Sequence, residues 1–234
     1  MQITTVLFDL DGTLLPMDQE VFVKAYLGHL AKFLAPHGYD PGAIVDAIWA
    51  GTGAMVKNDG SATNEEIFWK KFCSIFGEDA QKDEPLFQHF YETKFPAVQS
   101  SCGFNPKAAE AVAAIRNKGM KVALATNPIF PAIATRQRIR WAGLTPEDFE
   151  LYTTYENSCH CKPNLAYYQD VLDTLGVRGE ECLMVGNDAG EDMVAGKLGM
   201  KVFLLTDSLI DRGLDISQYP QGSFKELLAY IETL

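Results

Sequence analysis

Strand-like and helical segments alternate through the second half of this 234-residue chain, and that alternation constrains the fold more than any other feature. Short apolar runs suited to strands lie at residues 121–125, 151–153, 182–185 and 201–205. Helical patterns begin near Pro106, Pro131 and Pro163, and two more cover residues 192–198 and 224–231. Strands that alternate with helices favour a parallel sheet covered on both faces. The chain is therefore expected to adopt an α/β fold with a doubly wound parallel sheet.

The first strand is predicted at residues 4–8, and a long helical segment separates it from the others. This strand ends at Asp9. Residues 18–93 carry apolar side chains at helical spacing and show no convincing strand. The pair Asp40-Pro41 and a capping box at residues 63–66 mark two helix starts. We therefore expect a helical insertion after the first strand.

Composition and charge exclude several classes of protein. The length fits a core with an insertion, because domains span roughly 100–200 residues. No apolar run approaches the roughly 18 residues that a membrane helix needs, and the first residues lack the basic and apolar segments of a secretion signal. A net charge of −11 disfavours nucleic acid and anionic membranes as partners. A cytoplasmic protein that binds neither nucleic acid nor membrane is expected.

The cysteines favour free thiols. There are five of them, an odd number, in a sequence without an export signal. The run Cys159-His160-Cys161 could instead belong to a soft-metal site. Zinc sites usually draw four ligands at wider spacing, and the sequence shows no second cluster of Cys and His. Loop cysteines without a metal are therefore the favoured interpretation.

Chemically reactive side chains gather directly after the predicted strands. In parallel α/β sheets, functional groups lie beyond the carboxyl ends of the strands. The residues at these positions are Asp9, Asp11, Gly12 and Thr13 after the first strand, Thr126 and Asn127 after the second, Lys162 near the third, and Asn187, Asp188 and Asp192 after the fourth. Taken singly, each residue is compatible with an ordinary structural role, such as a turn residue, a helix cap or a surface lysine.

Together these residues form the set that phosphoryl transfer needs. Carboxylates at the ends of neighbouring strands repel one another unless a cation lies between them, and hard oxygen ligands of this kind suit Mg²⁺. A hydroxyl, an amide and a lysine supply hydrogen-bond donors for the oxygens of a transferred phosphoryl group. The set therefore predicts phosphoryl transfer through an aspartyl-phosphate.

The sequence resembles the haloacid dehalogenase superfamily of hydrolases, most of which are Mg²⁺-dependent phosphatases. Four motifs of that family occur in order: Asp9-Leu10-Asp11-Gly12-Thr13, a segment ending in Thr126, Lys162 before Pro163, and Asp188 with Asp192. The resemblance covers essentially the whole chain. It implies a Rossmann-like core formed by residues 1–15 and 96–234, with an α-helical cap at residues 16–95. It also implies a hydrolase that removes phosphate from a small phosphorylated metabolite.

The resemblance implies a role for each main motif residue. Asp9 is expected to attack phosphorus and to ligate Mg²⁺. Asp11 is expected to protonate the leaving oxygen and then activate water, while its main-chain carbonyl binds the metal. Thr126 and Lys162 are expected to bind the phosphoryl oxygens, with Lys162 also holding Asp9 in place. Asp188 is expected to be the second metal carboxylate.

Three further residues receive supporting roles. Asp192 is expected to support Asp188 or the waters of the metal. Asn127 follows Thr126 closely enough to contact phosphate or substrate. Asn187 occupies a position where members of the family vary, and we expect it to lie behind the metal ligands and orient them.

Other functions are compatible with much of the same pattern. A phosphomutase of the superfamily would use the same residues and differ in how the cap holds a bisphosphorylated intermediate. A 2-haloacid dehalogenase would use the nucleophile without a metal, and such members typically lack the second acid, here Asp11. A phospho-aspartate signalling module also uses a doubly wound sheet, but it is usually near half this length and has no cap. The sequence leaves the substrate and the oligomeric state open.

Overall fold

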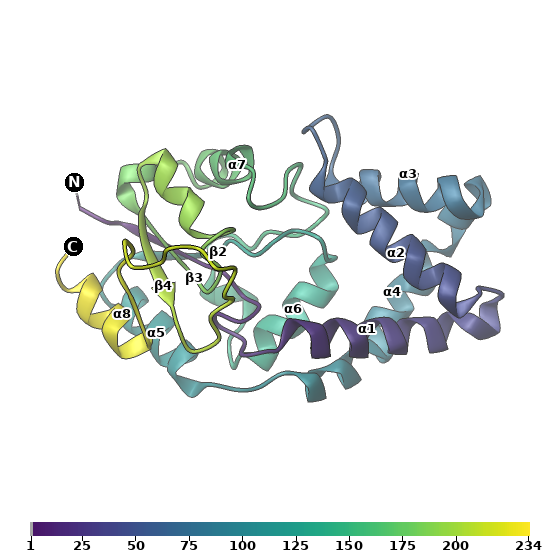
Figure 1. Ribbon diagram of the computed structural model, residues 1–234, viewed down its shortest axis with the longest axis horizontal. Coiled ribbons are helices and arrows are strands. Elements are labelled where there is room, and N and C mark those ends of the chain that lie inside the picture. Colours follow the sequence, from purple (N-terminus) through teal and green to yellow (C-terminus); the bar gives the residue numbers. More distant parts are fainter. Residues whose placement is uncertain (1) are drawn as a thin grey trace.

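Five parallel strands form a single sheet in the computed structural model, which describes residues 2–234 (Figure 1). Their order across the sheet is β2 (Lys121–Leu124), β1 (Thr5–Phe8), β3 (Cys182–Gly186), β4 (Lys201–Leu205) and β5 (Gln221–Gly222). Each neighbouring pair is parallel. The predicted parallel α/β sheet is therefore confirmed.

Helices cover both faces of this sheet. Side chains along each buried strand alternate between the two faces, so both faces carry apolar side chains that need to be covered. Val6 and Phe8 of β1 belong to an apolar cluster that includes residues of α5 (Pro106–Asn117) and α8 (Phe224–Ile231). Leu7 belongs to a different cluster, with residues of α7 (Leu165–Leu175). In Figure 1, α7 lies on one side of the sheet and α5 and α8 lie on the other. The fold is doubly wound, as predicted.

The segment between β1 and α5 is helical throughout its regular structure. Its α-helices are α1 (Gln19–Leu34), α2 (Pro41–Val56), α3 (Asn64–Phe76) and α4 (Glu84–Thr93). Short 3₁₀ turns lie at Ala35–His37, Glu78–Asp83 and Phe95–Ser101. The predicted starts are confirmed: Asp40 caps α2, and Thr63 and Glu66 form the capping box of α3. Figure 1 shows α1 to α4 grouped beyond one end of the sheet.

The remaining helical segments follow the strands in the predicted order. Helix α6 (Ala132–Trp141) begins directly after Pro131, and 3₁₀ turns occupy Pro146–Asp148, Gly179–Glu181 and Met193–Leu198. The predicted helix at residues 192–198 is therefore a 3₁₀ turn. Helix α7 starts two residues after Pro163, because the Asn164 side chain accepts a hydrogen bond from the main-chain N–H of Ala166 and caps the helix there.

The predicted strand at residues 151–153 is wrong. Within it only Tyr152 forms a bridge, with Leu124. The next residue, Thr153, donates its N–H to the main-chain oxygen of Leu124 at 3.0 Å and its hydroxyl to that of Thr126 at 2.6 Å, so the segment follows β2 without forming a strand. None of the helices in the described residues is both long enough and apolar enough to span a membrane.

Asn64, at the start of α3, connects the inserted helices to the part of the chain that forms the sheet. Its buried amide donates to the main-chain oxygen of Pro128 at 3.1 Å and to the Cys161 sulfur at 3.4 Å. Asn58 donates in turn to the Asn64 side-chain oxygen at 2.9 Å. The division into a core and a cap at residues 16–95 stays a prediction.

Candidate active site

The turn after β1 places Asp9 at the carboxyl edge of the sheet. The Asp9 N–H donates to the main-chain oxygen of Val185 at 2.9 Å, so the residue continues the pairing of β1 with β3. Gly12 follows with a φ of +87°, a conformation that residues with a side chain rarely adopt. A Cβ atom at Gly12 would also lie 2.2 Å from the Asn187 amide nitrogen. Glycine is therefore required where this turn approaches the loop after β3.

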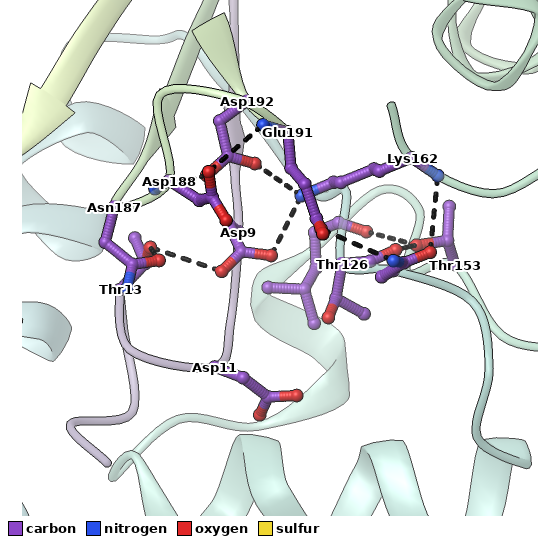
Figure 2. A network of polar contacts seen from close by, with 12 residues as sticks. Asp9, Asp11, Thr13, Thr126, Thr153, Lys162, Asn187, Asp188, Glu191 and Asp192 are labelled. Atoms are coloured by element: carbon purple, nitrogen blue, oxygen red, sulfur yellow. Dashed lines mark hydrogen bonds and ion pairs between the residues drawn. The ribbon is translucent and has the colours of Figure 1, made fainter. Parts of the chain in front are cut away.

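Lys162 lies between two carboxylates, as Figure 2 shows. Its Nζ atom donates to Asp9 Oδ1 at 2.9 Å and to Asp192 Oδ1 at 2.6 Å, and its side chain is 1% exposed. Burial alone would lower the pKa of Lys162, but the charges of Asp192 and Asp9 outweigh it and raise that pKa well above its usual value. Burial also raises the pKa of Asp192, and Lys162 opposes that shift. The lysine therefore carries a fixed positive charge beside Asp9.

Thr13 and Asn187 complete the surroundings of Asp9. The Thr13 hydroxyl lies 3.2 Å from Asp9 Oδ2 and 3.0 Å from Asn187 Oδ1, and it can donate to either oxygen. The Asn187 amide donates to the main-chain oxygen of Ser208 at 2.7 Å. Both oxygens of Asp9 thus have a protein donor within reach, and Asn187 joins the loops after β1, β3 and β4.

Asp188 is held by protein donors on both of its oxygens. Oδ1 accepts from the main-chain N–H groups of Gly190 at 2.8 Å and Glu191 at 3.2 Å. Oδ2 accepts from Arg212 Nε at 2.8 Å, and the same guanidinium lies 3.3 Å from Glu191 Oε1. Asp192 Oδ2 accepts from the Asp188 N–H at 3.1 Å. This bond connects Asp188 to the ion pair that Asp192 forms with Lys162. Arg212 was not predicted from the sequence, because no local motif points to it.

Asp11 is separate from this network. Its carboxylate forms an ion pair with Arg138 of α6, whose side chain is 1% exposed and whose guanidinium carbon lies 4.4 Å from the centre of the Phe130 ring. Burial raises the pKa of Asp11, and Arg138 opposes that shift. The Oδ1 atom of Asp11 is buried without a hydrogen-bond partner in the described residues. Figure 2 shows Asp11 apart from the group formed by Asp9, Lys162 and Asp192.

Thr126 and Asn127 follow β2 and face the same edge of the sheet. The main-chain oxygen of Thr126 accepts from the hydroxyls of Thr153 at 2.6 Å and Tyr167 at 2.8 Å, which fixes the loop. Asn127 Oδ1 accepts from the main-chain N–H of Lys162 at 3.3 Å, and Asn127 Nδ2 lies 3.4 Å from Glu191 Oε2. The loops after β2 and β3 and the loop before α7 therefore meet at one place.

These side chains surround a cavity of about 180 Å³. The lining includes the predicted residues Asp9, Asp11, Thr126, Asn127, Asn187, Asp188 and Asp192. It also includes Glu191, which was not predicted although it lies inside the last motif. Helix α1 contributes Gln19, Phe22 and Val23 to the lining. Apart from Lys162, whose Nζ contacts Asp9 and Asp192, every predicted site residue lines the cavity.

The oxygen atoms at the cavity fit a hard cation. Within residues 2–234, no group of three or more His, Cys, Asp or Glu side chains is arranged to hold a metal ion. Mg²⁺ does not need such a group, because it is usually bound by one or two carboxylates, several waters and substrate phosphate. Asp9 and Asp188 both line the cavity and carry carboxylates of the kind that Mg²⁺ binds, and Asp188 Oδ2 is bonded to Arg212 here.

In the Cys159-His160-Cys161 run, which could have belonged to a soft-metal site, His160 and Cys161 contact residues outside the run. His160 Nδ1 lies 2.7 Å from Asp170 Oδ2, and Cys161 Sγ accepts from the Asn64 amide. The five cysteines of the described chain are free.

The fold and the site define an α/β enzyme whose buried aspartate, directly after the inner strand β1, lines a partly open cavity at the carboxyl edge of the sheet. The model of the haloacid dehalogenase-like hydrolases matches residues 3–199, a range that contains every predicted site residue. The chain belongs to this family of hydrolases.

Individual relatives agree with this assignment. Pyrophosphatase PpaX of Bacillus cereus is 26% identical over 197 residues, which span 84% of this chain and 80% of that protein. A HAD phosphatase structure from Thermococcus onnurineus covers 99% of this chain and 98% of its own, with a TM-score of 0.62 and 21% identity. A 2-haloacid dehalogenase structure from Pseudomonas syringae covers 99% of both chains, with a TM-score of 0.66 and 18% identity. The two structures show a shared fold, and the predicted superfamily is confirmed.

Proposed function

We propose that the protein is a Mg²⁺-dependent phosphatase that hydrolyses a small phosphate monoester through an aspartyl-phosphate on Asp9. The observation that carries this proposal is the Asp9 carboxylate, which faces the cavity while Lys162 Nζ holds it from behind at 2.9 Å. A fixed nucleophile next to a buried positive charge suits attack on a phosphoryl group, whose negative charge must be stabilised during transfer.

The proposed hydrolysis has two steps. In the first, an Asp9 oxygen bonds to phosphorus as the bond to the alcohol oxygen breaks, while Thr126 and Asn127 donate to the phosphoryl oxygens. In the second, water attacks the phosphorus and Asp9 is released with inorganic phosphate. Asp11 gives its proton to the departing alcohol oxygen and later takes one from the attacking water, so it must leave its contact with Arg138 and turn towards Asp9.

Asp9, Asp188 and the main-chain oxygen of Asp11 are the proposed Mg²⁺ ligands, with Asp192 and Asn187 holding the ligand residues in position. The ion would neutralise charge on the transferred phosphoryl group. The inserted helices at residues 16–95 are proposed to act as the cap, because α1 supplies a wall of the cavity and would shield the reaction from water.

Mg²⁺ removal tests the metal assignment. We expect excess chelator to stop phosphate release and added Mg²⁺ to restore it. An Asp188→Asn variant should bind Mg²⁺ more weakly by calorimetry, because a carboxylate ligand is lost. Full turnover in excess chelator would contradict the metal assignment.

The Asp11→Asn variant tests the reaction class. Asparagine cannot donate or accept the transferred proton, so hydrolysis of alkyl phosphates should slow by roughly two to four orders of magnitude. The loss should be smaller on aryl phosphates, because aryl leaving groups need less protonation. Rates of phosphate release on a paired series of alkyl and aryl esters give the measurement.

Two results would count against a phosphatase. One is a wild-type rate for Asp11→Asn on alkyl phosphates. The other is faster release of halide from 2-haloacids than of phosphate from any ester by the unmodified enzyme, because halide needs no proton to leave. The second result would favour the dehalogenase alternative.

A further inference from the structure

The proposed reaction takes the carboxylate of Asp11 away from Arg138. The Arg138 side chain is 1% exposed, and its Nη1 atom pairs with Asp11 Oδ2. Within residues 2–234, Asp11 is the single carboxylate that forms an ion pair with this arginine. When Asp11 turns towards Asp9 to protonate the leaving oxygen, the guanidinium stays behind without a counter-charge. An unpaired buried charge is strongly unfavourable, so another anion is needed at this position.

The surroundings of Arg138 hold its guanidinium in place. The guanidinium carbon lies 4.4 Å from the centre of the Phe130 ring, and Nη2 donates to the Thr135 hydroxyl at 3.3 Å. The Nε atom is buried and has no hydrogen-bond partner in the described residues. The arginine therefore keeps a donor that Asp11 does not use, and a planar anion with two oxygens suits the fixed fork of a guanidinium.

The Asp11 carboxylate separates Arg138 from the cavity. Asp11 lines the cavity and Arg138 does not, although the two side chains are in contact. When the carboxylate turns away, the space that it leaves opens onto the arginine. Because Asp11 protonates the leaving oxygen, the leaving group is the part of the substrate nearest to this space. A carboxylate on the leaving group would have the same charge and shape as the group that it replaces.

Arg212 is a weaker candidate for binding a substrate anion. It contacts Asp188 and Glu191, and its side chain is 49% exposed. Water can therefore replace a carboxylate that Arg212 loses, and Glu191 stays beside it if Asp188 turns to a metal ion. The loss of one partner has little cost for an exposed cation. The buried Arg138 has neither water nor a second carboxylate in the described residues to compensate for its loss.

We propose that Arg138 binds a carboxylate of the leaving group once Asp11 has turned towards Asp9, so that the substrate is the phosphate monoester of a small hydroxy acid. The inference rests on the proposed phosphatase function and deepens it by naming the substrate class. The exchange of carboxylates keeps Arg138 paired during proton transfer, whereas an uncharged leaving group would leave it unpaired. The cavity volume of about 180 Å³ restricts the acid to a small one.

A matched pair of substrates tests the charge in the unmodified enzyme. Phosphoglycolate and its neutral carboxamide are nearly equal in size and differ in one negative charge. We expect kcat/KM to be at least about tenfold higher for the acid, because hydrogen bonds between opposite charges are the stronger ones. Pyrophosphate has an anionic leaving group without a carboxylate and should react more slowly than phosphoglycolate.

Two variants in an Asp11→Asn background assign this preference to Arg138. Adding Arg138→Met removes both members of the buried ion pair, so no charge is left without its partner and the protein should fold. Adding Arg140→Met instead removes the same charge from an exposed position on α6 outside the cavity lining, and it is the matched control. Thermal unfolding of each preparation checks the fold.

Binding of the two glycolyl compounds to these variants is measured as inhibition of aryl phosphate hydrolysis. In Asp11→Asn, and equally in the control, the acid should bind at least about tenfold more tightly than the amide. The added Arg138→Met should lower this ratio by at least about tenfold. An unchanged ratio would show that a group other than Arg138 binds the carboxylate, which would overturn the proposal.

The outcomes separate this inference from the proposed function. If the enzyme hydrolyses an aryl phosphate with Mg²⁺ but handles the amide or pyrophosphate as well as phosphoglycolate, the substrate class is wrong and the phosphatase function stands. Failure of both glycolyl compounds to react or compete would equally overturn the inference. If no phosphate ester reacts, the aryl phosphate included, the proposed function itself fails.

Discussion

Replacing Asp9 with asparagine is expected to abolish turnover while the protein stays folded. The asparagine oxygen can still accept from Lys162 or Thr13, and Lys162 keeps its second partner, Asp192. The amide cannot form the covalent phosphoryl intermediate, so phosphate release should fall by about 10⁴-fold or more. A phosphate-release assay and thermal unfolding of the same preparation give the two readouts.

Asp46→Asn is the matched control for this variant. Asp46 is exposed on α2 and does not line the cavity, so the same chemical change there should leave the rate unchanged. Turnover by Asp9→Asn near that of the control would show that Asp9 is not the nucleophile.

Replacing Lys162 with methionine is expected to cost both activity and stability. Methionine has a similar length and no charge, so Asp9 and Asp192 would face each other without the ammonium group between them. Removing one member of a buried ion pair typically costs about 3–5 kcal/mol, and the free energy of unfolding should fall by about that amount. Denaturant titration measures this fall, and the exposed Lys24→Met should change stability by less than about 0.5 kcal/mol.

A double variant separates the two effects of Lys162. Adding Asp192→Asn to Lys162→Met removes one of the two facing carboxylates, so part of the lost stability should return. Activity should stay low, because the cation that holds Asp9 is still missing. Recovery of activity together with stability would mean that Lys162 has only a structural role.

Most of the fold could be predicted because its strands are buried on both faces. Such strands appear in a sequence as uninterrupted apolar runs, and β1, β2, β3 and β4 were found in this way. Strand β5 has two residues, and Gln221 and Gly222 join the sheet only because Leu204 and Leu205 offer free hydrogen-bonding groups beside them. The error at residues 151–153 has a similar origin, since this segment pairs with β2 through one bridge only, at Tyr152, and its short apolar run does not reveal how far the pairing extends.

The four aspartates and the lysine of the site could be predicted from their order after the strands, whereas Glu191 and two arginines could not. Arg138 pairs with Asp11 across 127 positions of sequence, and Arg212 reaches Asp188 from a loop 24 residues away. Neither arginine belongs to a local pattern. Their partners depend on how α6 and the loop after β4 pack, and only the assembled structure shows that.

The position of β1 in the sheet has a consequence for the growing polypeptide on the ribosome. This strand precedes the other four in sequence, yet β2 and β3 lie on either side of it. Its four buried residues cannot pair with both β2 and β3 until residues 182–186 have been synthesised. Pairings between such distant segments form slowly. Strand edges that are still unpaired favour aggregation until those pairings form. Asp9 therefore meets Lys162 and Asp192 only after residue 192 has been synthesised, long after β1 itself.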